Sequence, residues 1–214
     1  MSSTTRRPRA DAVRNIEKIL VAARAVFSER GARAQLGEVA AAAGVSEATL
    51  YRHFAGREEL ILEVLRRRFA EDVAPVAALA LQRADPWQAM VDMLEVVLEV
   101  AEREQHTFAA ALSPDIFAEL AVRYFEDFGT VLRRAQEAGV VRADLVAADL
   151  PRLTTMLIAA QRLGGAADAM FLGMGSAGGG SGNGWRRYLA LLLDAMRPAA
   201  ATALPPFVLP SDPR

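Results

Sequence analysis

Apolar residues recur along this chain at the three- and four-residue spacing of amphipathic α-helices, without convincing two-residue strand alternation. The first apolar stripe runs from Val13 through Ile16 and Leu20 to Phe27. Gly31 follows the stripe and is a natural C-terminal stop for a helix. The pattern predicts an all-α fold that opens with a long amphipathic helix.

Two short helices are predicted next, over residues 36–43 and 46–54. Gly44 lies between them, and a glycine readily adopts the positive φ of a tight turn. Ser46 is placed to cap the second helix, with Glu47 favourably located in its first turn. Two short helices joined in this way form a helix-turn-helix, whose second helix is short enough to enter a DNA major groove.

Longer helices are predicted over the rest of the chain. Pro75 is expected to kink or divide the first of them, and Asp85 followed by Pro86 marks the start of the next. The predicted ranges are 57–80, 86–101, 114–138, 149–163 and 185–197.

The charge is divided unevenly along the chain, although the formal net charge is only −1. Residues 1–57 contain ten Arg or Lys and five Asp or Glu, a net +5, so the remainder carries −6. A basic head on an acidic body favours a nucleic-acid-binding head. Cysteine is absent, which excludes disulfides and fits a reducing cytoplasm. The polar, basic N-terminus predicts no secretory signal, and no apolar run reaches the ~20 residues of a membrane span.

An enzyme is the least supported class. The chain has two histidines, no cysteine, and none of the motifs HExxH, GxSxG or GxGxxG. Adjacent acids such as Glu58 and Glu59 point about 100° apart around a helix, so we interpret them as solvent-exposed side chains and not as a catalytic pair. We predict no catalytic residue, no metal site and no cofactor.

The residues around the helix-turn-helix form a longer recognisable series: ILVAARAVF at 19–27, RG at 30–31, VA at 39–40, AGVS at 43–46, TLYRHF at 49–54 and EEL at 58–60. With this series, the segment from about Arg14 to Leu65 resembles the N-terminal domain of the tetracycline-repressor (TetR) family. The remainder is similar to that family only in its helical architecture.

The resemblance implies that the chain has four parts. A flexible basic arm at 1–10, with Arg6, Arg7 and Arg9, precedes a three-helix helix-turn-helix DNA-binding domain at 11–56. A helical-bundle ligand-binding and dimerisation domain follows at 57–197, and a Pro-rich tail at 198–214. Residues 164–184 are expected to form a Gly-rich loop within the bundle.

The resemblance also implies DNA-contacting residues. Major-groove contacts are expected from Ser46, Glu47, Ala48 and Thr49, phosphate or sugar contacts from Tyr51 and His53, a phosphate or guanine contact from Arg52, and phosphate contacts from Gln35 and Arg57. Glu47 either contacts cytosine or serves only its helix dipole.

In the body, the resemblance implies a pocket for a small apolar or amphipathic ligand and a homodimer on a palindromic operator. The pocket candidates are Met90, Met93, Leu94, Phe108, Leu112, Phe117, Tyr124, Phe128, Met156 and Leu157. The dimer candidates are Leu153, Leu157, Leu189, Leu192 and Leu193. The prediction is a cytoplasmic, ligand-released repressor; a regulator without an inducer, an activator, or a helical scaffold that has lost DNA binding remain alternatives.

Overall fold

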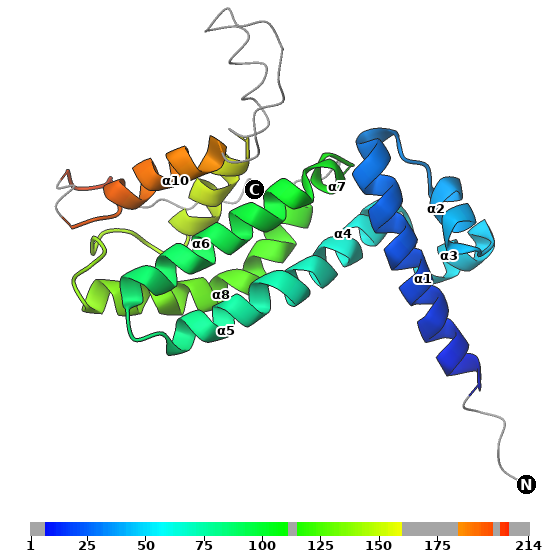
Figure 1. Ribbon diagram of the computed structural model, residues 1–214, viewed down its shortest axis with the longest axis horizontal. Coiled ribbons are helices and arrows are strands. Elements are labelled where there is room, and N and C mark those ends of the chain that lie inside the picture. Colours follow the sequence, from blue (N-terminus) through cyan, green and yellow to red (C-terminus); the bar gives the residue numbers. More distant parts are fainter. Residues whose placement is uncertain (1–6, 111–114, 160–183, 199–201, 206–214) are drawn as a thin grey trace, which may run out of the picture. The chain divides into compact units, whose positions relative to one another are not determined.

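The computed structural model describes residues 7–110, 115–159, 184–198 and 202–205. Within these ranges every regular element is a helix, which confirms the all-α prediction (Figure 1). The chain divides into two compact units. Unit 1 comprises residues 1–72 and 103–120, and unit 2 comprises residues 73–102 and 121–214. The predicted Gly-rich loop and most of the predicted tail lie outside the described residues.

Unit 1 contains the N-terminal helices and a helix from later in the chain. Its elements are α1 (Arg7–Arg30), the 3₁₀ turn η1 (Gly31–Arg33), α2 (Leu36–Ala43), α3 (Glu47–His53), α4 (Arg57–Arg68), all but the last residue of the π-helical segment η2 (Phe69–Val73), and α7 (Gln105–Ala110). The helix α1 packs against α2, α4 and α7. Unit 1 is therefore larger than the domain 11–56 expected from the sequence.

The boundaries of α1 follow from its ends. Gly31 terminates it with a φ of +53°, which confirms the predicted stop. At the other end α1 begins at Arg7, so the helix includes Arg7 and Arg9, which the sequence analysis placed in a flexible arm. Arg6 lies outside the described residues. Val13, at the start of the predicted apolar stripe, is 66% exposed, so the buried stripe begins later in the helix.

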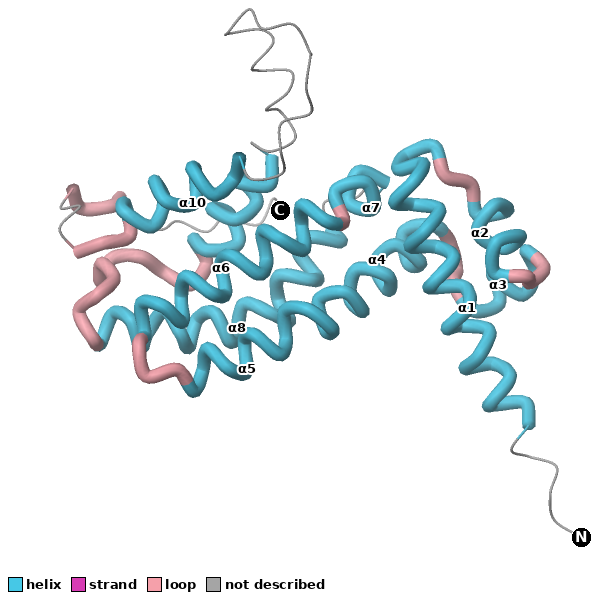
Figure 2. Tube along the Cα trace, viewed as in Figure 1, coloured by secondary structure: helices cyan, strands magenta, loops and turns pink. Residues whose placement is uncertain are grey.

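Unit 2 is also built from helices, which are coloured cyan along the chain trace in Figure 2. Its elements are α5 (Ala74–Gln82), most of α6 (Pro86–Arg103), most of α8 (Asp115–Glu137), a helical segment over residues 149–159, and α10 (Gly184–Ala195). Asp85 caps α6 as predicted, since its Oδ1 accepts from the backbone N–H groups of Trp87 and Gln88 at 3.0 and 3.1 Å. Asp85 and Pro86 thus define where α6 begins.

Pro75 marks the division of the predicted long helix 57–80. It has no backbone N–H, and its ring clashes with the carbonyl four residues earlier in an ideal α-helix. The five residues of η2 adopt π-helical geometry just before it, and α5 resumes at Ala74. The predicted division at Pro75 is thereby confirmed.

Long-range hydrogen bonds join the helices of unit 2. Arg134 of α8 donates to the carbonyls of Ala80 and Leu81 at the end of α5. Trp185 of α10 is buried, and its indole N–H donates to Glu102 of α6 at 3.0 Å. These contacts connect α5 with α8 and α6 with α10. Among the residues that the structure describes, no helix is both long and apolar enough to cross a membrane.

Candidate nucleic-acid interface

The turn between α2 and α3 is built on Gly44. Its φ of +66° lies in the left-handed region, which favours glycine. Its N–H donates to Ala41 at 3.1 Å, and the N–H of Val45 donates to Ala40 at 3.0 Å. These bonds satisfy the last carbonyls of α2 and direct the chain sharply into α3. The turn predicted from the sequence is confirmed.

Ser46 begins the second helix of the motif. Its Oγ accepts from the backbone N–H of Thr49 at 3.2 Å and lies 2.9 Å from Thr49 Oγ1. The predicted N-cap is therefore present. The hydroxyl contact also orients the Thr49 side chain before any partner is bound.

The two faces of α3 differ sharply in burial. Leu50 and Phe54 are 0% and 5% exposed and attach the helix to unit 1. Tyr51, in contrast, is 51% exposed. Of the other predicted DNA contacts in this segment, Ser46, Glu47, Ala48 and Arg52 are exposed, whereas Thr49 and His53 are half-buried. The structure thus gathers the predicted contacts of α3 on a helix held by apolar anchors.

Glu47 lies against α2. A Cβ added to Gly37 would lie 2.7 Å from Glu47 Oε1, so the absence of a side chain at Gly37 makes room for this carboxylate. Gly37 was not among the residues predicted to matter for the motif. Its only sequence signal is its place in the first turn of a helix. A glycine there lowers helix stability, so its presence indicates that a neighbouring group needs the space of a side chain.

His53 is less available than expected. Its Nε2 is buried and has no hydrogen-bond partner within the described part of the chain. In this arrangement a phosphate does not reach Nε2, so a contact through that atom requires the imidazole ring to move.

Gln35 precedes α2 and is exposed. Its backbone N–H donates to Glu38 Oε2 at 3.0 Å, and its own carboxamide donates to the Arg33 carbonyl at 3.5 Å. The carboxylate of Glu38 therefore satisfies the backbone N–H of Gln35 at the start of α2. The same carboxylate pairs with Arg30, which links α1 to α2.

Arg57 is placed differently from the prediction. Its guanidinium donates to the carbonyls of Gly31 and Ala32 at 3.0 and 3.1 Å, to Ala34, and through Nε to Ala110 at 3.2 Å. It also lies 5.3 Å from the centre of the Phe27 ring. The guanidinium is thus occupied by η1 and α7, in place of the expected phosphate contact.

The predicted pocket residues of the body are divided between the two units. Met90, Met93, Leu94 and Phe128 are buried in unit 2, but Phe108 is buried in unit 1. Leu112 and the side chains of Phe117 and Tyr124 lie outside the described residues, and Leu157 is half-buried. Met156 is 66% exposed and therefore does not line an enclosed pocket in this chain.

The predicted dimer residues are similarly divided. Leu189 is 2% exposed and belongs to the core, whereas Leu153, Leu157, Leu192 and Leu193 are half-buried. The most exposed large side chains on the described parts of these helices are Met156, Tyr188 and Leu191, at 66%, 49% and 58%, and none of them was among the dimer candidates. Helical spacing alone did not separate the core-facing positions from the outward-facing ones.

A capped short helix that follows a tight turn and presents polar groups defines a DNA-binding domain of the helix-turn-helix class. Residues 19–64 match the family model described as bacterial regulatory proteins, tetR family. A transcriptional repressor, BepR of Brucella suis, is 32% identical over 108 residues, which are 48% of this chain and 52% of that protein. A transcriptional activator, FasR of Mycolicibacterium smegmatis, is 31% identical over 103 residues, 48% of this chain and 47% of that protein. The matched region spans about half the length of these curated relatives.

Solved structures extend the similarity along the chain. A TetR transcriptional regulator from Streptomyces coelicolor has a TM-score of 0.55 and 26% identity, covering 86% of this chain and 98% of that one. The regulator PfmR of Thermus thermophilus has a TM-score of 0.53 and 22% identity, covering 92% and 97%, and supports the fold alone. Residues 19–64 thus match the DNA-binding region of the tetR family, and the rest of the chain is similar in fold to solved regulators of that family.

Proposed function

We propose that this protein is a homodimeric, sequence-specific transcriptional repressor that acts in the cytoplasm and leaves a palindromic operator when a small molecule binds its body. The observation that carries the proposal is the exposed polar and aromatic face of α3, held by the buried anchors Leu50 and Phe54. A rigid helix with exposed Tyr51 and Arg52 is suited to a major groove and its flanking phosphates.

The α3 residues divide by the contacts they offer. Ser46, Ala48 and Thr49 are at the start of the helix, which is the end that reaches base edges in helix-turn-helix proteins. Tyr51 and Arg52 follow, with a hydroxyl and a guanidinium suited to phosphates or to a guanine edge. Because Glu47 packs against Gly37, its carboxylate is better placed to support α2 and α3 than to contact cytosine.

The proposed dimer uses helix 149–159 and α10. Met156, Tyr188 and Leu191 are large, apolar or amphipathic, and roughly half or more exposed. Burial of such side chains against a second copy of the chain removes apolar surface from water and stabilises the dimer. A two-fold dimer presents two α3 helices and therefore requires a palindromic site.

Control by a ligand is the finer part of the proposal. The buried methionines Met90 and Met93 offer the adaptable apolar surface that such a pocket uses. The direction of regulation follows the relative named as a repressor, although the other curated relative is named as an activator.

The test is fluorescence anisotropy of the purified protein on DNA upstream of its own gene, against an unrelated duplex, at about 50 and 200 mM salt. The proposal expects a preference for the upstream DNA that persists at the higher salt, and a symmetric footprint. Equal affinity for both duplexes, together with no enriched sequence from a pool of random duplexes, would contradict it.

A further inference from the structure

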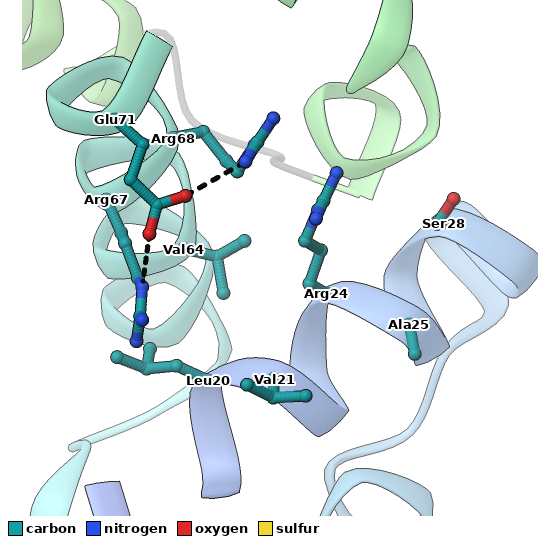
Figure 3. A pocket seen from close by; sticks show the side chains of 9 residues that line it. All are labelled: Leu20, Val21, Arg24, Ala25, Ser28, Val64, Arg67, Arg68 and Glu71. Atoms are coloured by element: carbon teal, nitrogen blue, oxygen red, sulfur yellow. Dashed lines mark hydrogen bonds and ion pairs between the residues drawn. The ribbon is translucent and has the colours of Figure 1, made fainter. Parts of the chain in front are cut away.

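A cavity of about 460 Å³ lies within unit 1, between α1 and the α4–η2 segment (Figure 3). None of the predicted pocket residues lines it. Its lining consists of Leu20, Val21, Arg24, Ala25 and Ser28 from α1, and Val64, Arg67, Arg68 and Glu71 from α4 and η2. Small-molecule sites in proteins commonly have this volume and combine an apolar wall with a few polar groups.

One wall of the cavity is apolar. Leu20 and Val64 are buried, and Ala25 continues the surface along α1. Val21 is 61% exposed, although valine is usually covered. A ligand that enters the cavity can therefore bury apolar surface of this wall that is otherwise exposed to solvent.

The other wall is cationic. Three arginines and one glutamate line the cavity (Figure 3). Arg67 is held by Glu71 at 2.8 Å and by Glu17, and its hydrogen bonds lower the pKa of both carboxyls. These acids stay ionised near neutral pH, so Arg67 is already neutralised locally.

Arg24 is different. Its Nε donates to Glu104 Oε1 at 3.0 Å, and Glu104 is 2% exposed. Its Nη1 and Nη2 make no hydrogen bond within the described residues, and its side chain is 44% exposed. Glu104 is also 3.2 Å from Arg68, so one buried carboxylate serves two guanidinium groups. The outer face of Arg24 thus remains open to an anion.

We propose that this cavity binds a small amphipathic carboxylate, with the carboxylate on the Nη groups of Arg24 and the apolar body against Leu20, Val21 and Val64. It is a second effector site, separate from the pocket proposed in the body. Its regulatory consequence rests on the proposed function. Because α1 packs against both α2 and α4, a ligand between α1 and α4 alters the support of the helix-turn-helix and lowers operator affinity.

The affinity test uses sodium decanoate as the probe, with full-length protein in a calorimeter. Val21→Asp places a negative charge at the cavity, and Val13→Asp makes the same change at a 66% exposed valine of α1 outside it. We expect Val21→Asp to weaken decanoate binding about tenfold or more, from like-charge repulsion and lost apolar contact, with Val13→Asp near wild type. Equal affinities for the two variants, or equal affinity of wild type for 1-decanol, would overturn the proposal.

The location test uses a decanoate that carries a photoreactive diazirine, followed by peptide mapping. Labels on residues 20–28 or 64–71 support the cavity. Labels confined to unit 2 overturn it, whether or not the protein binds DNA. Conversely, a protein that is labelled at the cavity but has no operator preference contradicts the proposed function and leaves the site intact. Labelling at the cavity with unchanged operator affinity overturns the regulatory part alone.

Discussion

The exposed face of α3 in unit 1 and the exposed face of helices 149–159 and α10 in unit 2 carry different kinds of side chain, and this difference separates their proposed partners. In unit 1 the exposed face of α3 combines Tyr51 and Arg52 with the polar side chains of Ser46 and Glu47. In unit 2 the helix over 149–159 and α10 expose the large side chains of Met156, Tyr188 and Leu191. A polar, hydrogen-bonding face suits DNA, whereas an apolar face suits a second copy of the chain.

The largest expected effect comes from the buried carboxylate of Glu104. It pairs with Arg24 and Arg68 and accepts from Thr107 Oγ1 at 3.1 Å. Glu104→Ala leaves two guanidinium groups without this partner, and we expect a loss of about 3–5 kcal/mol of unfolding free energy. Chemical denaturation measures it. Glu137→Ala, at an exposed acid of α8, serves as the control, and a Glu104→Ala loss no greater than the control's would contradict this role.

Arg57 and Arg52 sharpen the comparison within unit 1. Arg57→Ala removes a partly buried guanidinium that satisfies four carbonyls, so we expect a loss of roughly 2–3 kcal/mol in stability. Arg52→Ala, at an exposed position of α3, should leave stability nearly unchanged and weaken DNA binding. Thermal unfolding and anisotropy on the same preparations separate the two effects. A fully stable Arg57→Ala protein with weak DNA binding would restore the phosphate role expected from the sequence.

The N-cap of α3 has a smaller effect. Ser46→Ala removes the acceptor of the Thr49 N–H and should lower stability by about 1 kcal/mol. It also frees the Thr49 hydroxyl, so we expect a change in sequence preference. Glu137→Ala, at the exposed acid of α8, again serves as the control, here for denaturation and for binding-site selection. Identical stabilities for the two variants would show that the cap is dispensable.

The smallest effect concerns residues 202–205 in unit 2. Asp144 pairs with Arg142 and accepts from the Leu204 N–H at 2.9 Å, which holds the pKa of its carboxyl well below the usual 3.8. A depressed folded-state pKa stabilises this contact above pH 3.8 and loses that contribution as pH falls through the folded value. We expect Asp144→Asn to accelerate amide exchange at Leu204 at neutral pH, while Glu137→Gln leaves it unchanged. Equal protection in both variants would remove Asp144 as the anchor.

The sequence predicted features that depend on neighbouring residues. Gly31, Gly44, Ser46, Pro75 and Asp85 each act within a turn or two of their own position, so their effects can be inferred from local chemistry. The helix-turn-helix contains three of these five signals or lies beside them, which is why its boundaries were predicted well.

The sequence did not predict features that depend on distant partners. Arg24 is 80 residues from Glu104, and Arg57 is 53 residues from Ala110. Nothing in the neighbouring sequence shows that the half-buried guanidinium of Arg57 binds backbone carbonyls and not a phosphate. Likewise, Leu189 and Leu192 lie on the same predicted apolar stripe, yet Leu189 is 2% exposed and Leu192 is only half-buried.

The central claim is that the exposed face of α3 binds DNA, and anisotropy of three variants on one selected duplex tests it most directly. Tyr51→Ala and Arg52→Gln alter that face, whereas Arg133→Gln removes the same single charge from an exposed position of α8 in unit 2. The account predicts that the first two variants weaken binding about tenfold, with dimerisation unchanged by light scattering, and that Arg133→Gln binds like wild type. Wild-type affinity for Tyr51→Ala and Arg52→Gln, or the same loss for Arg133→Gln, would contradict it.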